Sequence, residues 1–406
     1  MNTWPIHSLI ASLILTCTAI SDEPKPAVLI NAGDYETIQA ALNALPASGG
    51  MVRLPPGTIE IDKPLEIKTP ETRIEGSGAS THIKNSNSTG KPAFLIQPGN
   101  FAEDNKAKLW RIQLGNFRIS GNEKSGDGIR AVNIQEIFLQ GMSIDHNGGH
   151  GIALIDCYED PRVSDSILTY NKKAGLYIDG NHDIVVNANH FEENEDAVVC
   201  IDSFNLCMNG NNIDDHLGNG VVIENTYGSV VSGNMIEECN GTAIILDRDC
   251  YGITLSANVI AHHLKGGIDL RDANGCTVSG NTFVLTHHFG VKMSGESGRN
   301  TVTGNNFSNT YIGGGLDKRP SEGKTPMHID IGTGVVLKGS RHIIISGNSF
   351  SGMDQGAVSG SGGCRSILVN GNVITDINRR SDQPTRAIDL GDGENCLIKD
   401  NLIDTP

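Results

Sequence analysis

A short motif centred on asparagine recurs along the chain every 22 to 24 residues, and this repeat restricts the fold more than any other feature. Typical copies read VVSGNMI, TVSGNTF and IISGNSF, so a small residue usually precedes the Asn. The first six copies are separated by 22, 23, 24, 23 and 24 residues, and Asp165 extends the series backward by 24. The repeated residues are Asn189, Asn211, Asn234, Asn258, Asn281, Asn305, Asn348, Asn372 and Asn401.

A second series keeps the same register, with a small residue standing before a pair of β-branched or apolar residues. It comprises Gly128, Gly151, Gly175, Ala197, Gly220, Ala243, Gly267, Gly290, Gly334, Ala357 and Ala387. The agreement of the two series predicts one repeat domain, where a length of 406 residues alone would suggest two or three domains.

The apolar residues around each Asn alternate, as Val231 and Ile236 do around Asn234, and this is the period of a strand. Each repeat then holds about three short strands separated by turns. One such coil cannot bury its apolar face, so neighbouring coils must stack. We predict an all-β right-handed parallel β-helix of roughly ten to eleven coils. A leucine-rich repeat is excluded, since its LxxLxL signature is missing and no helix recurs.

The repeated asparagines are interpreted as structural residues. Each lies at a sharp bend, where its amide can bond to the backbone and to the Asn of the next coil. None of them is therefore a candidate site residue.

The segment 34–50, DYETIQAALNALPASGG, is the one helix that the sequence predicts, with apolar Ile38, Ala41, Leu42 and Leu45 on one face. It precedes the repeats, so we expect residues 22–50 to cap the first coil and to cover its strand edges. The coils then occupy about 51–406. Breaks in the register predict inserted loops near 311–332 and 379–386.

The first 21 residues have the pattern of a cleaved secretory signal peptide, with an apolar run at 9–15 and small residues around 19–21. The run is too short to anchor the chain across a bilayer. A lipoprotein is disfavoured because Thr16 is a poor residue before Cys17. No later stretch is long and apolar enough to cross a membrane, so we expect a secreted or periplasmic protein without membrane insertion of the mature chain.

Net charge limits the binding partners that we expect, and the cysteine positions limit the disulfides. A formal net charge of −16 argues against nucleic acid and acidic membranes, which both require a basic face. Eight cysteines remain after signal cleavage, but no two of them hold the same position on consecutive coils. We expect few disulfides or none, with Cys276 and Cys396 at inward strand positions.

The opening of the mature chain resembles the pectin lyase-like superfamily, and in particular its pectate-lyase-type N-terminal segment. The motifs are DYETIQAALNALP at 34–46, GGMVRLPPGTIEI at 49–61 and RIEGSGAST at 73–81. With the GN turns, the resemblance covers nearly all of the mature chain. It implies that the GN turn lies between the second and third strands of each coil. It also implies polysaccharide binding on the outer face of the first strand and the preceding turn, but it does not choose among lyases, hydrolases, epimerases and tailspikes.

If the second series starts the first strand, side chains two and four positions later point outward. These are Tyr177 and Asp179, Val222 and Glu224, Ile245 and Asp247, Asp269 and Arg271, Lys292 and Ser294, and Val336 and Lys338. The middle coils gather Asp247, Asp269, Arg271 and Lys292, and the preceding turns carry His262, His263, His287 and His288. We take Asp247, Asp269, Arg271, Lys292, His263 and His288 as the candidate catalytic residues.

Two reaction types would use this set. In β-elimination on a polyuronate, Arg271 or Lys292 would neutralise the sugar carboxylate, with or without a Ca²⁺ ion held by Asp247 and Asp269, and a His or Lys292 would take the proton. In hydrolysis, the two carboxyl groups would act as acid and as base or nucleophile. The leading hypothesis is a lyase or epimerase that acts on an acidic glycan. The alternatives are a glycoside hydrolase and a non-catalytic glycan-binding β-helix, in which the charges only form exposed ion pairs.

Three other motifs are interpreted as turn residues. The GHG sequence at 149–151 and the pair Asp214 and Asp215 appear in the opposite order from polygalacturonase-like hydrolases, and the RIK of that family is absent. The sequence YEDP at 158–161 is only loosely similar to motifs of alginate epimerases and lyases. The two HH pairs lack a usual zinc spacing.

Overall fold

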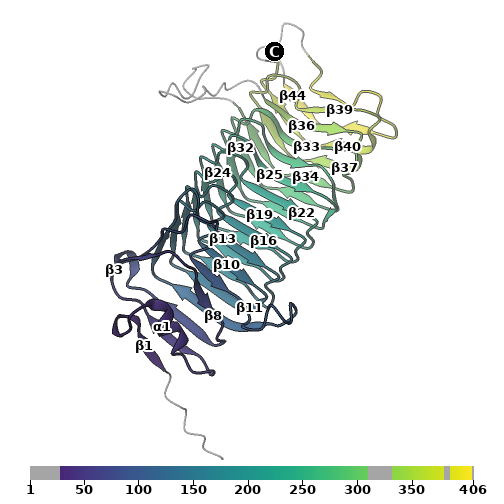
Figure 1. Ribbon diagram of the computed structural model, residues 1–406. Helices are drawn as coiled ribbons and strands as arrows, with labels where there is room; N and C mark the ends of the chain where they lie inside the picture. The colour runs from purple at the N-terminus through teal and green to yellow at the C-terminus, as the bar shows by residue number, and fades with distance from the viewer. Residues whose placement is uncertain (1–27, 310–331, 379–384, 405–406) are drawn as a thin grey trace, which may run out of the picture.

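The computed structural model describes residues 28–309, 332–378 and 385–404, which form one elongated solenoid (Figure 1). Except at the N-terminal end, each coil contributes one strand to each of three long parallel sheets, of 13, 15 and 14 strands. In chain order within a coil we name them sheets I, II and III. The predicted all-β parallel β-helix with three strands per coil is confirmed.

Sheet I begins each coil, and its outer face carries the predicted site. Its strands are β4 (Leu65–Ile67), β7 (Phe94–Ile96), β10 (Ile129–Val132), β13 (Ile152–Ile155), β16 (Leu176–Asp179), β19 (Val198–Ile201), β22 (Val221–Glu224), β25 (Thr242–Asp247), β29 (Gly266–Leu270), β33 (His288–Met293), β36 (Gly332–Lys338), β39 (Val358–Ser361) and β42 (Ile388–Asp389).

Sheet II follows sheet I after a short turn. Its strands are β1 (Leu29–Asn31), β2 (Gly50–Arg53), β5 (Thr72–Glu75), β8 (Leu109–Gly115), β11 (Ile134–Gln140), β14 (Arg162–Ser164), β17 (Val185–Asn187), β20 (Cys207–Asn209), β23 (Val230–Ser232), β27 (Thr254–Ser256), β31 (Thr277–Ser279), β34 (Thr301–Thr303), β37 (Arg341–Ser346), β40 (Arg365–Asn370) and β43 (Leu397–Lys399).

Sheet III completes the coil. Its strands are β3 (Gly57–Ile61), β6 (Thr81–Asn85), β9 (Arg118–Ser120), β12 (Ser143–Asp145), β15 (Ile167–Thr169), β18 (His190–Glu192), β21 (Asn212–Asp214), β24 (Met235–Glu237), β28 (Val259–Ala261), β32 (Thr282–Val284), β35 (Asn306–Ser308), β38 (Ser349–Ser351), β41 (Val373–Thr375) and β44 (Leu402–Asp404). A small extra pair joins β26 (Cys250–Tyr251) and β30 (Ala273–Asn274).

The solenoid has about 14 turns, so the prediction of ten to eleven coils was too low. The uncounted coils lie mainly before Gly128, where the strands are present but the repeated Asn motif is not in register. The coil between β5 and β8 is also extended, since the paired residues Thr72 and Ile112 are 40 positions apart. Counting the repeated Asn motif therefore missed coils that lack it in register.

The asparagine ladder forms as predicted between sheets II and III. In each buried step from Asn189 to Asn348, Nδ2 donates to Oδ1 of the next Asn at 2.9 to 3.1 Å. The extension to Asp165 was wrong by one residue. Ser166 holds that position, and its backbone N–H donates to Oδ1 of Asn189 at 3.1 Å.

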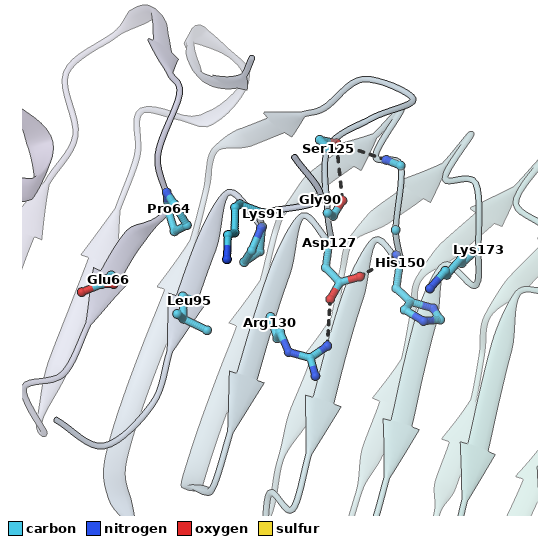
Figure 2. A pocket seen from close by; sticks show the side chains of 14 residues that line it. Pro64, Glu66, Gly90, Lys91, Leu95, Ser125, Asp127, Arg130, His150 and Lys173 are labelled. Carbon is cyan, nitrogen blue, oxygen red and sulfur yellow. Dashed lines mark hydrogen bonds and ion pairs between the residues drawn. The ribbon is translucent and has the colours of Figure 1, made fainter. Parts of the chain in front are cut away.

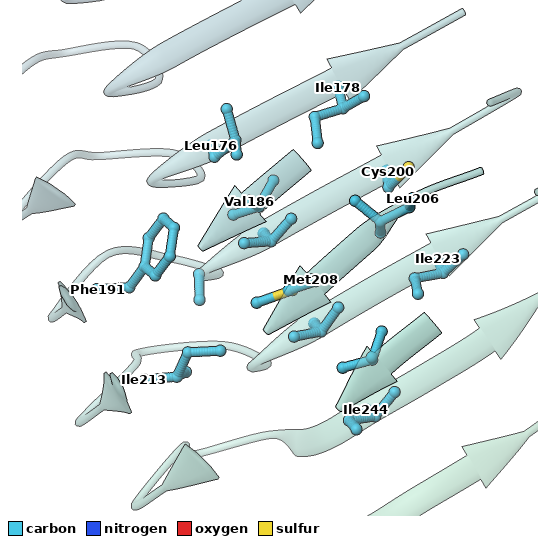
Figure 3. Close-up of a cluster of buried hydrophobic side chains, with 14 of the residues drawn as sticks. Leu176, Ile178, Val186, Phe191, Cys200, Leu206, Met208, Ile213, Ile223 and Ile244 are labelled. Atoms are coloured by element: carbon cyan, nitrogen blue, oxygen red, sulfur yellow. The ribbon is translucent and has the colours of Figure 1, made fainter. Parts of the chain in front are cut away.

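Apolar columns fill the interior, as Figure 3 shows for the middle coils. Leu176, Val198 and Val221 stack from coil to coil in sheet I because they are register partners on adjacent parallel strands. Farther along, the rings of Phe283, Phe307 and Phe350 stack with centroids 4.6 Å apart. Burial of these columns is the main favourable contribution to stability, since a single coil has no core of its own.

The N-terminal end is covered, although by a shorter helix than predicted. The helix α1 spans only Ile38–Asn43, with Thr37 as N-cap accepting the backbone N–H of Ala40 at 3.1 Å. A 3₁₀ turn, η1 (Ala32–Asp34), precedes it, and a second, η2 (Gly78–Ser80), leads into β6. Ile38, Ala41 and Leu42 are buried as expected. Pro46 and the glycines after it end the helical stretch early.

Three further predictions concern the signal segment with the inserted loops, membrane crossing, and the cysteines. The signal segment and most of the two inserted loops lie outside the described residues. Within the described ranges, no helix combines the length and apolarity that a bilayer crossing would need. All eight cysteines from Cys157 to Cys396 are free, which agrees with the expected lack of disulfides. Cys276 is buried, but it lies just before β31, and Cys396 is only partly buried.

Candidate functional site

The outer face of sheet I has the predicted alternation. In β16, Leu176 and Ile178 are buried in the core, and Tyr177 and Asp179 between and after them are partly exposed. The register then places Ile245, Asp269 and Lys292 in one outward column, and Asp247 beside Arg271 in the next. Strand pairing thus brings four of the six predicted residues together.

The centre of this mixed-charge patch, which we define as Asp247, Asp269, Arg271 and Lys292, is the carboxylate of Asp269. Its Oδ2 accepts hydrogen bonds from Arg271 Nε and Lys292 Nζ, both at 3.1 Å. The Asp269 side chain is only 4% exposed, whereas Lys292 and Arg271 are 25% and 45% exposed. Asp269 Oδ1 is buried without a hydrogen-bond partner among the described residues. The carboxylate therefore holds two cations at the surface while one of its own oxygens stays unsatisfied.

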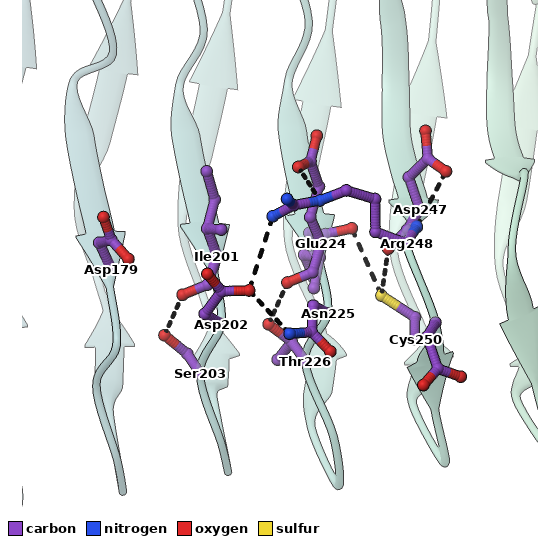
Figure 4. A network of polar contacts seen from close by, with 12 residues as sticks. Asp179, Ile201, Asp202, Ser203, Glu224, Asn225, Thr226, Asp247, Arg248 and Cys250 are labelled. Atoms are coloured by element: carbon purple, nitrogen blue, oxygen red, sulfur yellow. Dashed lines mark hydrogen bonds and ion pairs between the residues drawn. The ribbon is translucent and has the colours of Figure 1, made fainter.

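Asp247 lies at the edge of the patch and leads into a second network. Its Oδ2 is 3.5 Å from Arg271 Nη1, and its Oδ1 accepts the backbone N–H of Arg248 at 2.9 Å. Figure 4 shows Arg248 reaching across to neighbouring coils, where Nε is 2.6 Å from Glu224 Oε2 and Nη2 is 3.6 Å from Asp202 Oδ1. These pairs fix the orientation of Asp247.

The predicted histidines do not join the patch. His263 is fully buried, its Nε2 bonds to the carbonyl oxygen of Ile236 at 3.0 Å, and its Nδ1 accepts the Cys239 N–H at 3.3 Å. Burial lowers the pKa of His263 to about 3, so it is a neutral core residue, and its assignment as catalytic is corrected. His288 is exposed at the start of β33, where its ring contacts His287. It is four residues before Lys292, roughly 13 Å along the strand.

Asp247 and Asp269 do not fit a Ca²⁺ site in this arrangement. Calcium takes six to eight oxygen ligands, but the nearest charged groups are Arg271 and Lys292, and Asp269 Oδ2 is bound to both. An ion would have to displace them.

Among the described residues, side chains that could bind a metal ion cluster elsewhere, at the carboxyl ends of the sheet III strands β21, β24 and β28. One group is Glu237, Glu238 and His262, and a second is Asp214, Asp215 and Glu238, each with ligand atoms within 4.8 Å of one another. His262 Nδ1 is 2.9 Å from Glu237 Oε1. Burial and the charges of Asp215, Glu237 and Glu192 raise the pKa of Asp214. Asp214, Asp215 and His262, which the sequence interpretation treated as separate turn residues, therefore lie with Glu237 and Glu238 in one acidic cluster.

The sequence interpretation missed a basic groove on the same outer face, nearer the N-terminus. Figure 2 shows it between the turns before β7, β10, β13 and β16. Its volume is about 670 Å³, and its charged lining comprises Glu66, Lys91, Asp127, Arg130, His150 and Lys173. Glycines form much of the wall. A Cβ on Gly149 would lie 2.3 Å from Asp127 Oδ1, so only glycine allows this approach.

His150, the middle residue of the GHG sequence, is the least usual group in the groove. Burial, together with the charges of Lys173 and Arg130, lowers its pKa to about 4, although Asp127 opposes the shift. Its ring stacks on Tyr177 with centroids 4.6 Å apart, and its Nδ1 is buried without a partner among the described residues. Asp127 accepts the His150 backbone N–H at 2.8 Å and Arg130 Nη1 at 3.2 Å.

A sequence signal for this groove exists. Arg130 is two residues after Gly128, so the rule that selected Asp269 and Lys292 also selects Arg130 as an outward residue. Applying the rule only from Gly175 onward left it out. The turn residues Lys91 and Lys173 carry no such signal, because turns have no fixed alternation.

Comparisons with known proteins agree with the fold. Residues 163–325 match the family described as periplasmic copper-binding protein (NosD), and residues 71–204 match the family described as right handed beta helix region. No curated protein matches the sequence.

Several solved structures are similar at low sequence identity. The family 28 exopolygalacturonase of Yersinia enterocolitica has a TM-score of 0.58 at 12% identity, over 93% of this chain and 78% of that one. Tailspike protein 3 of bacteriophage CBA120 has a TM-score of 0.55 at 13% identity, over 91% and 61%. The DFA-IIIase of Arthrobacter chlorophenolicus A6 has a TM-score of 0.53 at 13% identity, over 76% and 85%.

The chain spans only about three fifths of two viral proteins that it matches, 61% of the tailspike and 62% of ORF18 of Geobacillus virus E2. At such identities these likenesses bear on the fold alone. With the family matches and the three parallel sheets, they identify the chain as a right-handed parallel β-helix protein with the fold of the pectin lyase-like superfamily.

Proposed function

We propose that the protein is a polysaccharide-active enzyme, a lyase or epimerase that acts on an acidic, uronate-containing glycan on the outer face of sheet I. The observation that carries the proposal is the carboxylate of Asp269, buried between Arg271 and Lys292 at 3.1 Å from each. A buried anion that presents two cations at a surface is suited to binding a sugar carboxylate next to a proton-transfer group.

In the proposed reaction, Arg271 binds the carboxylate of the sugar because its planar guanidinium matches a carboxylate and is the more exposed of the two cations. Neutralising that charge makes the proton on the adjacent carbon easier to remove. Lys292 takes this proton in its neutral amine form, after its own proton has passed to solvent, and Asp269 positions the Lys292 and Arg271 side chains. In elimination the departing oxygen takes its proton from solvent water, because His288 lies roughly 13 Å along the strand from Lys292 and does not reach the same sugar ring. No step is assigned to a Ca²⁺ ion.

Hydrolysis is the alternative reaction, and the two carboxyl groups of Asp247 and Asp269, linked through Arg271, support it. The exopolygalacturonase and the DFA-IIIase are, by name, enzymes on this fold. A copper-binding function is not proposed from the NosD match, since the acidic cluster at Glu237, Glu238 and His262 offers mainly carboxylates, which suit harder cations.

The test is incubation of the purified protein with uronans and neutral glycans, each with Ca²⁺ or with EDTA. A lyase produces unsaturated ends that absorb ultraviolet light, and an epimerase changes the sugar composition without cleavage. New reducing ends alone would replace the proposal with hydrolysis. Binding without any chemical change would replace it with the non-catalytic alternative, and neither binding nor change would refute a glycan function.

We further propose a secreted or periplasmic location after removal of residues 1–21. Expression in a host with a secretory pathway, followed by N-terminal sequencing of the exported protein, tests this. A chain that stays in the cytoplasm at full length would contradict it.

A further inference from the structure

The basic groove is separate from the mixed-charge patch, although both lie on sheet I. Arg130 and Lys292 occupy the same outward column, and seven strand steps separate β10 from β33. At the spacing of parallel strands this is about 34 Å. A ligand that reaches both must be a polymer of several sugar units.

Positive charge gathers in the groove against the overall charge of the chain. Lys91, Arg130 and Lys173 line it together with two carboxylates, Glu66 and Asp127, in a protein of net charge −16. Asp127 is buried and already bonded to Arg130 and to a backbone N–H. The other lining carboxylate, Glu66, pairs with Lys68 outside the groove. Lys91 and Lys173 therefore form no ion pair with the described carboxylates of the lining.

The His150 ring is held in place at the wall of the groove. Nδ1 is buried and lacks a partner among the described residues. The residue as a whole is partly exposed and lines the groove beside Arg130 and Lys173. The ring is fixed from one side by Tyr177, whose hydroxyl donates to Asp179 Oδ2 at 3.1 Å.

We propose that the basic groove is a second, non-catalytic binding site for the polymer, in which Arg130 and Lys173 bind a uronate carboxylate and His150 takes up a proton as that carboxylate binds. The identity of the polymer rests on the proposed function. The existence of an anion site in the groove does not.

The proton uptake follows from the charges that face His150. Arg130 and Lys173 disfavour the imidazolium ion, and Asp127 favours it. A bound carboxylate adds a negative charge beside the ring and neutralises the two cations, so it favours the imidazolium ion. By linkage, affinity then rises as the pH falls through the pKa of His150 in the complex toward about 4, its pKa in the free protein, by tenfold in total for each unit by which binding raises that pKa.

The experiment is isothermal titration of the full-length protein with uronate trisaccharides, too short to span groove and patch, in buffers of different ionisation enthalpy. Galacturonate, mannuronate, guluronate and glucuronate trimers are tested, with a neutral glucose trimer and a sulfated trisaccharide as comparisons. We expect binding of at least one uronate trimer, with up to one proton taken up near pH 5. The Lys292→Ala variant prevents turnover, and its groove must still bind the trimer with the affinity that the groove has in the wild type.

Substitutions then assign the site. Arg130→Ala and Lys173→Ala should each weaken binding about tenfold or more, whereas Lys172→Ala, the exposed neighbour outside the groove, should not. His150→Gln should keep binding at pH 7 but lose the proton uptake. Thermal unfolding of each variant checks its fold.

The outcomes separate the two proposals. Trimer binding that depends on Arg130 and Lys173 in a protein inactive on every glycan would leave the groove site standing and refute only the enzyme. Absence of binding by all four uronate trimers, or binding unaffected by Lys173→Ala, would overturn the groove site even in an active enzyme. Equal affinity for the sulfated sugar would overturn the assignment to uronate.

Discussion

Asn234 donates from Nδ2 to Oδ1 of Asn258 at 3.0 Å, and the same oxygen accepts the backbone N–H of Asn234, also at 3.0 Å. Asn258 repeats both bonds with Asn281 and donates to the carbonyl oxygen of Val231 at 3.0 Å. All these side chains are buried. Each ladder Asn therefore satisfies several polar groups that water cannot reach.

Removing one member of the ladder should be costly. Asn258→Ala removes the acceptor of the Asn234 backbone N–H and the donor to the Val231 carbonyl, and it takes one hydrogen bond each from Asn234 Nδ2 and Asn281 Oδ1. We therefore expect a loss of roughly 3 kcal/mol or more in the free energy of unfolding. Urea denaturation measures it. Asn306→Ala, at an exposed position on β35, is the control and should be nearly neutral. Equal effects of the two changes would disprove the structural interpretation of the ladder.

The patch makes a prediction about turnover. Lys292→Ala and Arg271→Ala should each lower kcat by about a hundredfold or more if they act in proton transfer and charge neutralisation. The thermal transition should fall only moderately, because each variant leaves the buried Asp269 carboxylate paired with the other cation. Lys338→Ala, at an exposed outward position on the same sheet, is the matched control. Full activity in both patch variants would eliminate the patch as the reaction centre.

Phenylalanine stacking explains the glycine at position 290. A Cβ there would lie 2.5 Å from the ring of Phe307, which is itself stacked between Phe283 and Phe350. Gly290→Ala should destabilise the protein by roughly 1 to 3 kcal/mol through overpacking. Gly33→Ala is the comparison, since its Cβ would meet nothing closer than 3.8 Å. Calorimetry should show a clear drop in Tm for the first variant only.

Acid should destabilise the fold through buried histidines. Burial lowers the pKa of His216 to about 4 and that of His263 to about 3, whereas both are near 6.5 in the unfolded chain. Between these values the unfolded chain binds more protons, so stability is full above pH 6.5 and falls as the pH drops toward 4, by at most about 3 kcal/mol for each histidine.

Urea denaturation at pH 7.5, 5.5 and 4.5 measures this slope. His263→Gln should flatten the slope, and His146→Gln, which removes an exposed histidine, should leave it as in the wild type. A slope unchanged by His263→Gln would contradict the assignment.

Thiol reactivity should follow burial. Cys207 is exposed, whereas burial raises the pKa of Cys157 and Cys200 to about 12. A maleimide should label Cys207 first in the native protein, and the buried thiols only after unfolding. Mass spectrometry of the labelled peptides shows the order, and Cys207→Ser should remove the fast phase. A reducing agent should not change Tm, because the eight described cysteines form no disulfide.

The fold was largely predictable because one register repeats with little change. Asn234 and Val231 identify the turn and the inward strand positions, and the same pattern recurs in the neighbouring coils. The coils before Gly128 were undercounted, since they are held by strand pairing without the Asn signal. Asp165 was misplaced because Ser166 accepts the same ladder role with a different side chain.

The candidate site was predictable only where it lies on strands. Asp269, Arg271 and Lys292 came together because alternation and register place them. His263 was misplaced because a turn has no periodicity to separate inward from outward side chains, and His150 was interpreted as a simple turn residue for the same reason. Whether His263 and His150 point inward or outward depends on how the turns of successive coils pack against each other. The sequence of a single repeat does not carry that information.

The parallel stacking of sheet I fixes the distance between the groove and the patch. Each coil adds one strand spacing of about 4.8 Å between groove and patch. Deleting a whole coil, for example the 23 residues from Val199 to Val221, would keep every register while shortening the gap by one step. Deleting a single residue would instead turn a strand inside out. The distance between the two proposed sites can thus be changed one coil at a time.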